Sequence, residues 1–332
     1  MAAGRVIDVQ AHVVPRVYLD RLASRSDLPR VERDAGTGRC WIHSGPGLRT
    51  PVATAMVDLE TRLTEMDAAG VDVELLSTTL PGVEMFEDTA FGVDLARAAN
   101  NELASIVTSA PDRFLAMAAL PLQDPAAARR ELERAVSELG FAAGGLYTNV
   151  QGRMLDDTSL ELDQLFELAQ RLDVPLFLHP TYPVLAPHVQ DSNLIPIIGF
   201  MLDTTLATTR LIFSGLLARY PALKLVVHHL AATLPFLIRR IDYESGRMPN
   251  GWARIGEAPS EAFKRLWVDV VNPDPEAIRM TRQLLGLDQL VFGTDHPFWD
   301  PRDAMRTVGA LGWPPDATAA LLGGNAARLL KL

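Results

Sequence analysis

The chain has 332 residues, 48% of them hydrophobic, and a formal net charge of −10. This length allows one large domain, and α/β barrels of this size are routinely single domains. The acidic balance argues against nucleic acid as a partner, because a phosphate-binding surface needs clustered Lys and Arg. The single cysteine, Cys40, excludes an internal disulfide and fits a reducing cytoplasm. With no signal-peptide pattern and no run approaching the roughly 18 apolar residues of a membrane span, we expect a soluble cytoplasmic protein without membrane contact.

Short apolar runs alternate along the chain with longer segments of helical period. The predicted strands are Val6–Val9, Val71–Ser77, Phe114–Leu120, Ala143–Tyr147, Val174–His179, Leu223–His229, Leu266–Val270 and Leu290–Thr294. The predicted helices between them are Met56–Ala69, Thr89–Ala110, Pro125–Leu139, Ser159–Leu172, Thr204–Arg219, Leu234–Tyr243 and Asp274–Leu285. Strands that alternate with helices form βαβ units and a parallel sheet.

Eight such units in about 300 residues predict a closed (β/α)8 TIM barrel, with residues 1–332 as one domain. The alternative, a doubly wound sheet, would want a glycine fingerprint after the first strand, and "DVQAHVVPR" does not contain one. One region breaks the alternation. Residues 15–55 are rich in Gly, Pro and charge, and we interpret this insertion as a lid over the active-site face, with an unstructured insertion as the alternative.

Polar residues follow four of the predicted strands at the point where each strand ends. They are Gln10 and His12, then His179, then His228 and His229, and finally Asp295 and His296. Five of the seven histidines lie at these positions, and only His43 and His188 lie elsewhere. Because parallel barrel strands end on the same face, these side chains should converge on a space about 10 Å across. A divalent cation would offset the cost of burying them, and His with Asp is a normal ligand set for Zn²⁺ or a similar metal.

The two-residue period of a strand sorts these neighbours. Gln10 and His12 point to the same side, whereas His228 and His229 point to opposite sides. We assign the barrel mouth to His229, because it ends the apolar run and starts the loop. Asp295 is assigned to the metal, since a carboxylate is the better partner for a cation. His296 is left either as a substrate contact or as a packing residue.

Five segments carry a family resemblance: "IDVQAHVVP", "VPLFLHP", "LKLVVHHLAATLPFLIRRID", "LVFGTDHPF" and "LLGGNAARLLKL", which together span residues 7 to 332. On these segments the sequence resembles the amidohydrolase superfamily, in the branch related to aminocarboxymuconate semialdehyde decarboxylase and the dihydroxybenzoate decarboxylases. The resemblance implies metal ligands at His179 and Asp295, and an acid/base or polarising role for His229. Decarboxylating relatives also use a lid arginine to hold a substrate carboxylate, and Arg49 is the nearest candidate.

This chain departs from the family pattern at two places. The family's first-strand motif is His-x-His, whereas this chain has Gln10-Ala11-His12, and Ala231-Ala232 replace glycines after His229. Three outcomes are compatible with Gln10. A metal, Zn²⁺ first, is held by His12, His179 and Asp295 with Gln10 as a weaker fourth partner. Alternatively the site takes a harder ion such as Mn²⁺, or it has lost the metal.

The leading functional hypothesis is non-oxidative decarboxylation of a small aromatic or unsaturated carboxylic acid, with the metal as Lewis acid and His229 as acid/base. The second is metal-dependent hydrolysis of an ester, lactone or amide, with Asp295 or His229 moving the proton. The third, which Gln10 keeps open, is a metal-free lyase or binding protein.

Candidate substrate-lining residues after the middle strands are Trp41, Met85, Phe86, Tyr147 and Asn149, each of which the sequence favours as packing over contact. Aromatic residues in "PTYP" and "HPFWDP" favour a flat, unsaturated small-molecule substrate. An apolar outer stripe on Leu194–Leu202 indicates a homodimer, in which the partner chain can supply the lid arginine.

Overall fold

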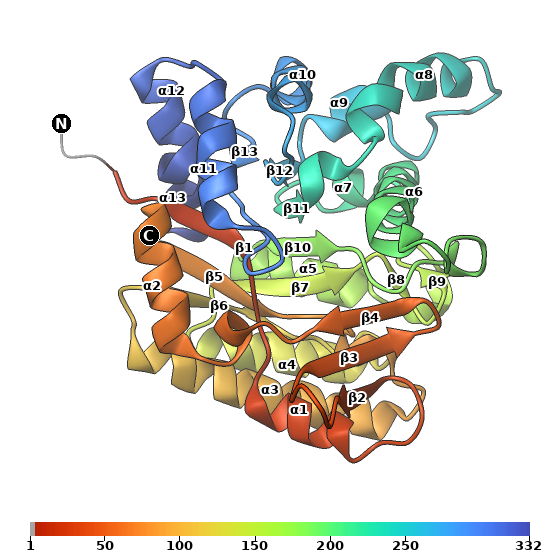
Figure 1. Ribbon diagram of the computed structural model, residues 1–332. Coiled ribbons are helices and arrows are strands. Elements are labelled where there is room, and N and C mark those ends of the chain that lie inside the picture. The colour runs from red at the N-terminus through yellow and green to blue at the C-terminus, as the bar shows by residue number, and fades with distance from the viewer. Residues whose placement is uncertain (1–3) are drawn as a thin grey trace.

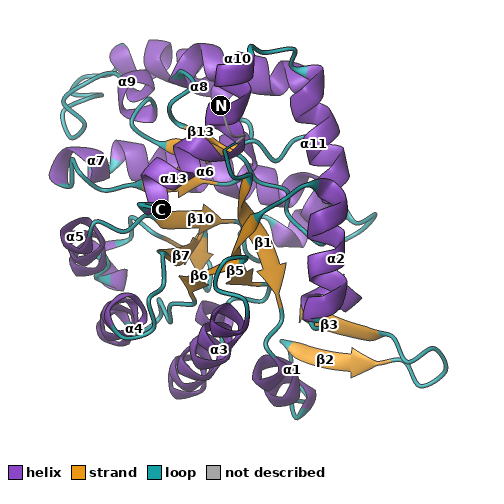
Figure 2. Cartoon of the chain, turned by 90° about the vertical axis from the view of Figure 1, so that its left-hand side faces the viewer, coloured by secondary structure: helices purple, strands orange, loops and turns teal. Residues whose placement is uncertain are grey.

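Eight parallel strands form a ring at the centre of the protein in the computed structural model, which describes residues 4–332. In ring order the strands are β1 (Ile7–Val13), β5 (Val73–Thr78), β6 (Phe114–Ala118), β7 (Ala143–Tyr147), β10 (Leu176–His179), β11 (Leu225–Val227), β12 (Trp267–Asp269) and β13 (Leu290–Val291). The ring closes where the chain after β13 meets β1: the Val9 amide donates to the Phe292 carbonyl at 2.9 Å and the His12 amide to the His296 carbonyl at 2.7 Å. The predicted TIM barrel is confirmed (Figure 2).

The strands form because nearly continuous apolar runs are buried on both faces. All seven residues of β1 are buried, and so are all three of β11. Strands covered by helices outside and by packed side chains inside show this pattern, rather than an alternation of apolar and polar residues. Each of the eight predicted strands overlaps one strand of the ring. β1 extends past the predicted Val9 boundary, so Gln10 and His12 lie within the strand.

Helices cover the outside of the barrel (Figures 1 and 2). Those that follow successive strands are α2 (Leu59–Ala69), α3 (Thr89–Ser109), α4 (Pro125–Ser137), α5 (Asp163–Leu172), α6 (Phe200–Phe213), α8 (Leu234–Gly246) and α10 (Pro275–Leu285). Asp58, Asp88 and Asp124 cap the first three by accepting a hydrogen bond from a first-turn amide. The chain ends with α11 (Pro301–Ala310), α12 (Pro315–Ala319) and α13 (Asn325–Leu330), which the periodicity did not identify.

One predicted helix, Thr204–Arg219, is divided in the structure. α6 ends at Phe213, and a short α7 (Leu216–Arg219) follows. Between them Gly215 has φ +75°, and a Cβ there would lie 2.4 Å from the Arg254 carbonyl oxygen. The break therefore needs a glycine, both for its conformation and for this close backbone approach.

The predicted insertion is ordered. It contains α1 (Arg16–Ala23) and a three-stranded antiparallel sheet of β2 (Arg30–Arg33), β3 (Cys40–Gly45) and β4 (Leu48–Pro51). The alternative of an unstructured insertion is therefore wrong. Figure 1 shows this small sheet on the side of the barrel where β1 ends. Its action as a lid stays a prediction.

One helical run, Ile195–Phe213, is long and apolar enough to cross a membrane by length and composition alone. The expectation that no run approaches this limit was therefore too strict. Half of its most apolar window is buried against the rest of the protein, as in the core helix of a barrel.

A buried ion network joins α2 to the end of β1. The guanidinium of Arg62, which is fully buried, pairs with Glu74 at 2.5 Å and donates to the backbone carbonyl of His12. His296 lies in the same network, with its Nδ1 2.7 Å from Glu74 and its Nε2 2.7 Å from Glu65. These contacts fix the position of the strand that carries Gln10 and His12.

Replacing Arg62 with Ala should lower the free energy of unfolding of the metal-free protein by about 3–5 kcal/mol, because the buried Glu74 would lose its guanidinium partner and keep only His296. Urea denaturation would measure the loss. Arg240 forms an exposed pair with Glu244 at 3.8 Å, so Arg240→Ala is the matched control and should change stability by less than about 1 kcal/mol. Equal effects of the two substitutions would contradict a structural role for the network.

Candidate metal centre and active site

Three side chains, two from the strands β1 and β10 and one from the loop after β13, meet at the C-terminal mouth of the barrel. The ligand atoms of His12, His179 and Asp295 all lie within 4.8 Å of one another. His12 Nε2 is 2.9 Å from Asp295 Oδ1, and its Nδ1 is 3.0 Å from the Ser77 hydroxyl. A carboxylate and two imidazoles at this spacing suit a divalent ion such as Zn²⁺ or Mn²⁺.

Gln10 lies beside His12 on the same face of β1, as the strand period predicted. Its amide Nε2 is 3.0 Å from His229 Nε2 and donates to Asp295 Oδ1 at 3.2 Å. Its Oε1 is buried and has no hydrogen-bond donor among the described residues. An orphaned acceptor next to a carboxylate–imidazole cluster is costly to bury, and a cation would satisfy it.

The protonation states suit a metal ligand set. His179 Nδ1 donates to the Pro180 carbonyl at 2.7 Å, which leaves Nε2 free to coordinate. Burial lowers the pKa of His179 well below its usual value, and the nearby imidazoles lower it further. Burial would raise the pKa of Asp295, but its contacts with His12 and His229 outweigh burial and hold that pKa well below the ordinary range. A neutral imidazole and an ionised carboxylate are the forms that bind cations.

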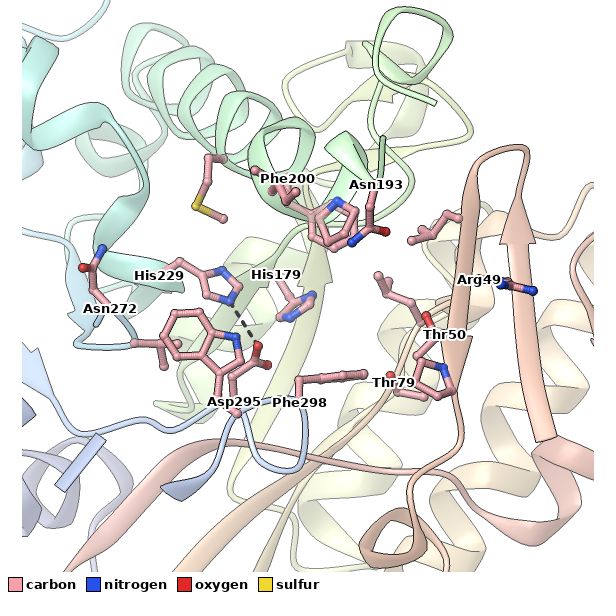
Figure 3. A pocket seen from close by; sticks show the side chains of 18 residues that line it. Arg49, Thr50, Thr79, His179, Asn193, Phe200, His229, Asn272, Asp295 and Phe298 are labelled. Carbon is pink, nitrogen blue, oxygen red and sulfur yellow. Dashed lines mark ion pairs between the residues drawn. The ribbon is translucent and has the colours of Figure 1, made fainter. Parts of the chain in front are cut away.

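His229 borders the same cluster from the loop after β11. Its Nε2 is 3.8 Å from Asp295 Oδ2, the contact drawn as a dashed line in Figure 3. Burial would lower the pKa of His229, but the Asp295 carboxylate outweighs it and raises that pKa. The raised pKa favours the protonated form of His229, which lines the cavity at the side of the candidate metal centre, where it can face a bound substrate.

His229 lines the cavity and His228 does not, in agreement with the prediction that only His229 enters the barrel mouth. The Nδ1 of His228 donates to Asp269 Oδ2 at 2.5 Å, and the other oxygen of Asp269 accepts the His229 backbone amide at 2.8 Å. Asp269 therefore fixes both histidines from the end of β12. Sequence reasoning missed it, because in "WVDVV" the carboxylate lies inside the apolar run and does not end it; its signal is a charged residue within a buried strand.

The turn after His229 has an unusual backbone. His229, Leu230, Ala231 and Ala232 all have φ 56°. Ala232 combines this with ψ −118°, a region that glycine adopts readily and alanine does not. The family resemblance leads us to expect glycines at positions 231 and 232, and this backbone favours glycine. The chain has alanines there instead.

Two predicted residues lie away from the cluster. His296 is held by Glu74 and Glu65 in the buried ion network. Of its two predicted roles, substrate contact or packing residue, these contacts favour the packing residue. The guanidinium of Arg49 stacks over Trp41, 4.7 Å from the ring centroid, and Figure 3 shows it directed away from Asp295. In this structure Arg49 contributes to the rim of the cavity but does not reach the cluster.

A cavity of about 580 Å³ opens above the cluster, and His179, His229 and Asp295 form its polar base. Its walls come from β4 of the insertion, the loop after β5, the start of α6 and the loops after β12 and β13. None of the five earlier candidates (Trp41, Met85, Phe86, Tyr147 and Asn149) is among the lining residues of this cavity, which agrees with their interpretation as packing residues. The aromatic residues Phe298 and Trp299 from "HPFWDP" do line it.

Replacing Ala232 with Gly should raise the free energy of unfolding of the metal-free protein by about 1 kcal/mol, because the strained backbone is relieved. Urea denaturation would measure the gain. Ala68 lies on an exposed face of α2, so Ala68→Gly is the control and should cost about 1 kcal/mol. A loss of stability in both variants would show that Ala232 is not strained.

Comparison with known proteins agrees with this architecture. The amidohydrolase family profile matches residues 7–332. The chain is 34% identical over 262 residues to a gamma-resorcylate decarboxylase of Rhizobium radiobacter, covering 72% of this chain and 76% of the relative. Its structure is similar to 5-carboxyvanillate decarboxylase from Sphingomonas paucimobilis (TM-score 0.84, 28% identity, 99% of both chains). It is also similar to dihydroxybenzoic acid decarboxylase from Polaromonas sp. JS666 with bound manganese and 2-nitroresorcinol (TM-score 0.83, 26% identity, 99% of this chain and 97% of that chain). The chain therefore belongs to the amidohydrolase family, as the sequence predicted.

Proposed function

We propose that this protein is a divalent-metal-dependent, non-oxidative decarboxylase of a small aromatic carboxylic acid. The observation that carries the proposal is the position of His229: an imidazole 3.8 Å from the Asp295 carboxylate, beside a carboxylate–imidazole cluster that fits a cation, at the base of a cavity. The similar proteins named as decarboxylases of resorcylate, carboxyvanillate and dihydroxybenzoate support the same reaction.

His12, His179 and Asp295 would hold the ion, which would supply a Lewis acid for the oxygens of the substrate. His229 Nε2 gives its proton to the ring carbon that bears the carboxylate. The carbon–carbon bond then breaks, its electron pair restores the aromatic ring, and CO₂ leaves. Asp295 stabilises the protonated form of His229 until the transfer, and Asp269 holds the His229 backbone in place.

Gln10 is proposed as the fourth ligand through its carbonyl oxygen. A rotation of the amide by half a turn exchanges Oε1 and Nε2. The observed orientation directs Nε2 to Asp295 and leaves Oε1 without a donor. The exchanged orientation brings Oε1 next to His229 Nε2 and to the Asp295 carboxylate. There Oε1 would accept a hydrogen bond from a protonated His229 or serve, with Asp295, as a ligand of a cation. With two oxygen donors the ligand set suits Mn²⁺ as well as Zn²⁺, and the Polaromonas relative carries manganese.

His229→Ala should lower the rate of CO₂ release by about 10²–10⁴-fold, the usual contribution of a positioned acid or base. Binding of Mn²⁺ should stay within a few-fold of the wild-type value, because His229 is not one of the proposed ligands. CO₂ evolution from metal-replete protein with a panel of hydroxybenzoates measures the first quantity, and titration against a competing chelator measures the second.

The matched control for this experiment is His188→Ala, which removes an exposed histidine outside the cavity. Its activity should equal that of the wild type. Products decide between reaction types: release of CO₂ without an added water supports the decarboxylase, whereas an added water without CO₂ supports hydrolysis and overturns the proposal.

Gln10→Ala should weaken Mn²⁺ binding by about 10–100-fold, and Gln10→Glu should strengthen it by adding a negative charge. The EPR signal of free Mn²⁺ in a titration gives both affinities without reference to activity. Gln123→Ala is the matched control and should leave Mn²⁺ affinity unchanged. The Gln123 Oε1 is also buried without a donor, but its Nε2 donates to the Val83 carbonyl, away from the cluster. Wild-type affinity in Gln10→Ala would remove Gln10 from the ligand set.

A further inference from the structure

The cavity is much larger than a single aromatic ring needs. Its volume is about 580 Å³, whereas a cavity of about 150 Å³ accommodates benzene. A hydroxybenzoate held at the polar base would therefore leave most of the space above it to be filled. The lining of that upper space should show which substituent fits.

The upper walls are apolar. They are lined by Leu80, Ile197, Phe200, Met201 and Trp299, among others. Phe298 continues this apolar surface down to His12, with 5.5 Å between the two ring centroids. Three of these keep large exposed fractions in the free protein: 62% for Ile197, 40% for Phe298 and 39% for Trp299. Large apolar side chains gathered at the mouth of a cavity are typical of a surface that a ligand covers.

The polar side chains on the walls are neutral. They are the hydroxyls of Thr50 and Thr79 and the amides of Asn193 and Asn272, which can pair with phenolic hydroxyls but cannot balance a charge. Arg49 is the single Lys or Arg among the described residues that line the cavity, and its guanidinium lies over Trp41, outside the space above Asp295. A second carboxylate on the substrate would therefore be desolvated without a cationic partner.

We infer that the upper cavity is a subsite for an extended apolar substituent, so that the substrate class is the phenolic monocarboxylic acids that carry an alkyl chain of several carbons. This inference rests on the proposed decarboxylase function. It separates this chain from the relative named for 5-carboxyvanillate, a substrate with two carboxylates.

The test compares two sets of substrates with metal-replete protein. The first set is 2-hydroxybenzoates with an unbranched alkyl chain of zero to five carbons at ring position 4 or 6, and the second is the diacid 5-carboxyvanillate. In the better alkyl series kcat/KM should rise about fourfold for each of the first added methylenes, mainly through KM, as apolar area is buried. The diacid should be about 100-fold poorer than the best monoacid.

A flat or falling series, or a diacid that equals the best monoacid, would overturn the inference. CO₂ release from short monoacids would still leave the proposed decarboxylase function intact in that case. If no acid releases CO₂, the proposed function fails, and with it the substrate class. Calorimetric binding of 3-alkylphenols then shows separately whether the apolar subsite exists.

Two matched variants locate the subsite. Met201→Ser shortens and polarises one wall, so the gain in kcat/KM per added methylene should shrink. Met280→Ser makes the same chemical change on α10, outside the cavity, where the Met280 side chain is exposed. It should leave the chain-length series unchanged. A series that is equally steep in both variants would contradict the placement of the subsite.

Discussion

The contact between the Asp295 carboxylate and the imidazoles of His12 and His229 is the interaction on which the C-terminal face of the barrel depends. The same stretch of chain also closes the barrel, because the Asp295 amide donates to the Gln10 carbonyl at 2.8 Å. Closure of the ring therefore brings a strand near the N-terminus and a loop 285 residues later into one cluster. Geometry of the site and integrity of the fold are controlled by the same few backbone bonds.

A large part of the site was predictable because parallel barrel strands place their C-terminal ends on one face. That rule, applied to apolar runs followed by His or Asp, was enough to group His12, His179, His229 and Asp295. It was not enough for His296, which follows Asp295 in the sequence. Past the end of a strand the alternation of side chains no longer holds, and the partners that bury His296, Glu74 and Glu65, come from other elements.

Other features depended on contacts that no local pattern contains. Asp269 matters because its two oxygens serve two adjacent histidines of a neighbouring strand. The division of the Thr204–Arg219 helix depends on the approach of the Arg254 backbone to Gly215. Likewise, the direction of Arg49 is set by stacking on Trp41 across the antiparallel sheet of the insertion. In the first two cases the deciding partner is about 40 residues away in sequence, and in the third it lies on the neighbouring strand of the same sheet.

The neutral amide at position 10 and the neutral cavity walls together determine where positive charge lies in the site. Asp295 is the single carboxylate among the grouped side chains. Burial favours the neutral form of His179, and the Gln10 amide carries no charge. With a divalent cation and a protonated His229 this base would have a net charge of about +2, and a carboxylate in place of the amide would reduce that to about +1. Among the described residues of the walls, no cationic side chain points into the cavity to attract an acid, because the Arg49 guanidinium stacks on Trp41. A neutral ligand at position 10 therefore concentrates the positive potential at the base of the cavity. There it orients one carboxylate toward His229 and leaves the walls free to bind an apolar group.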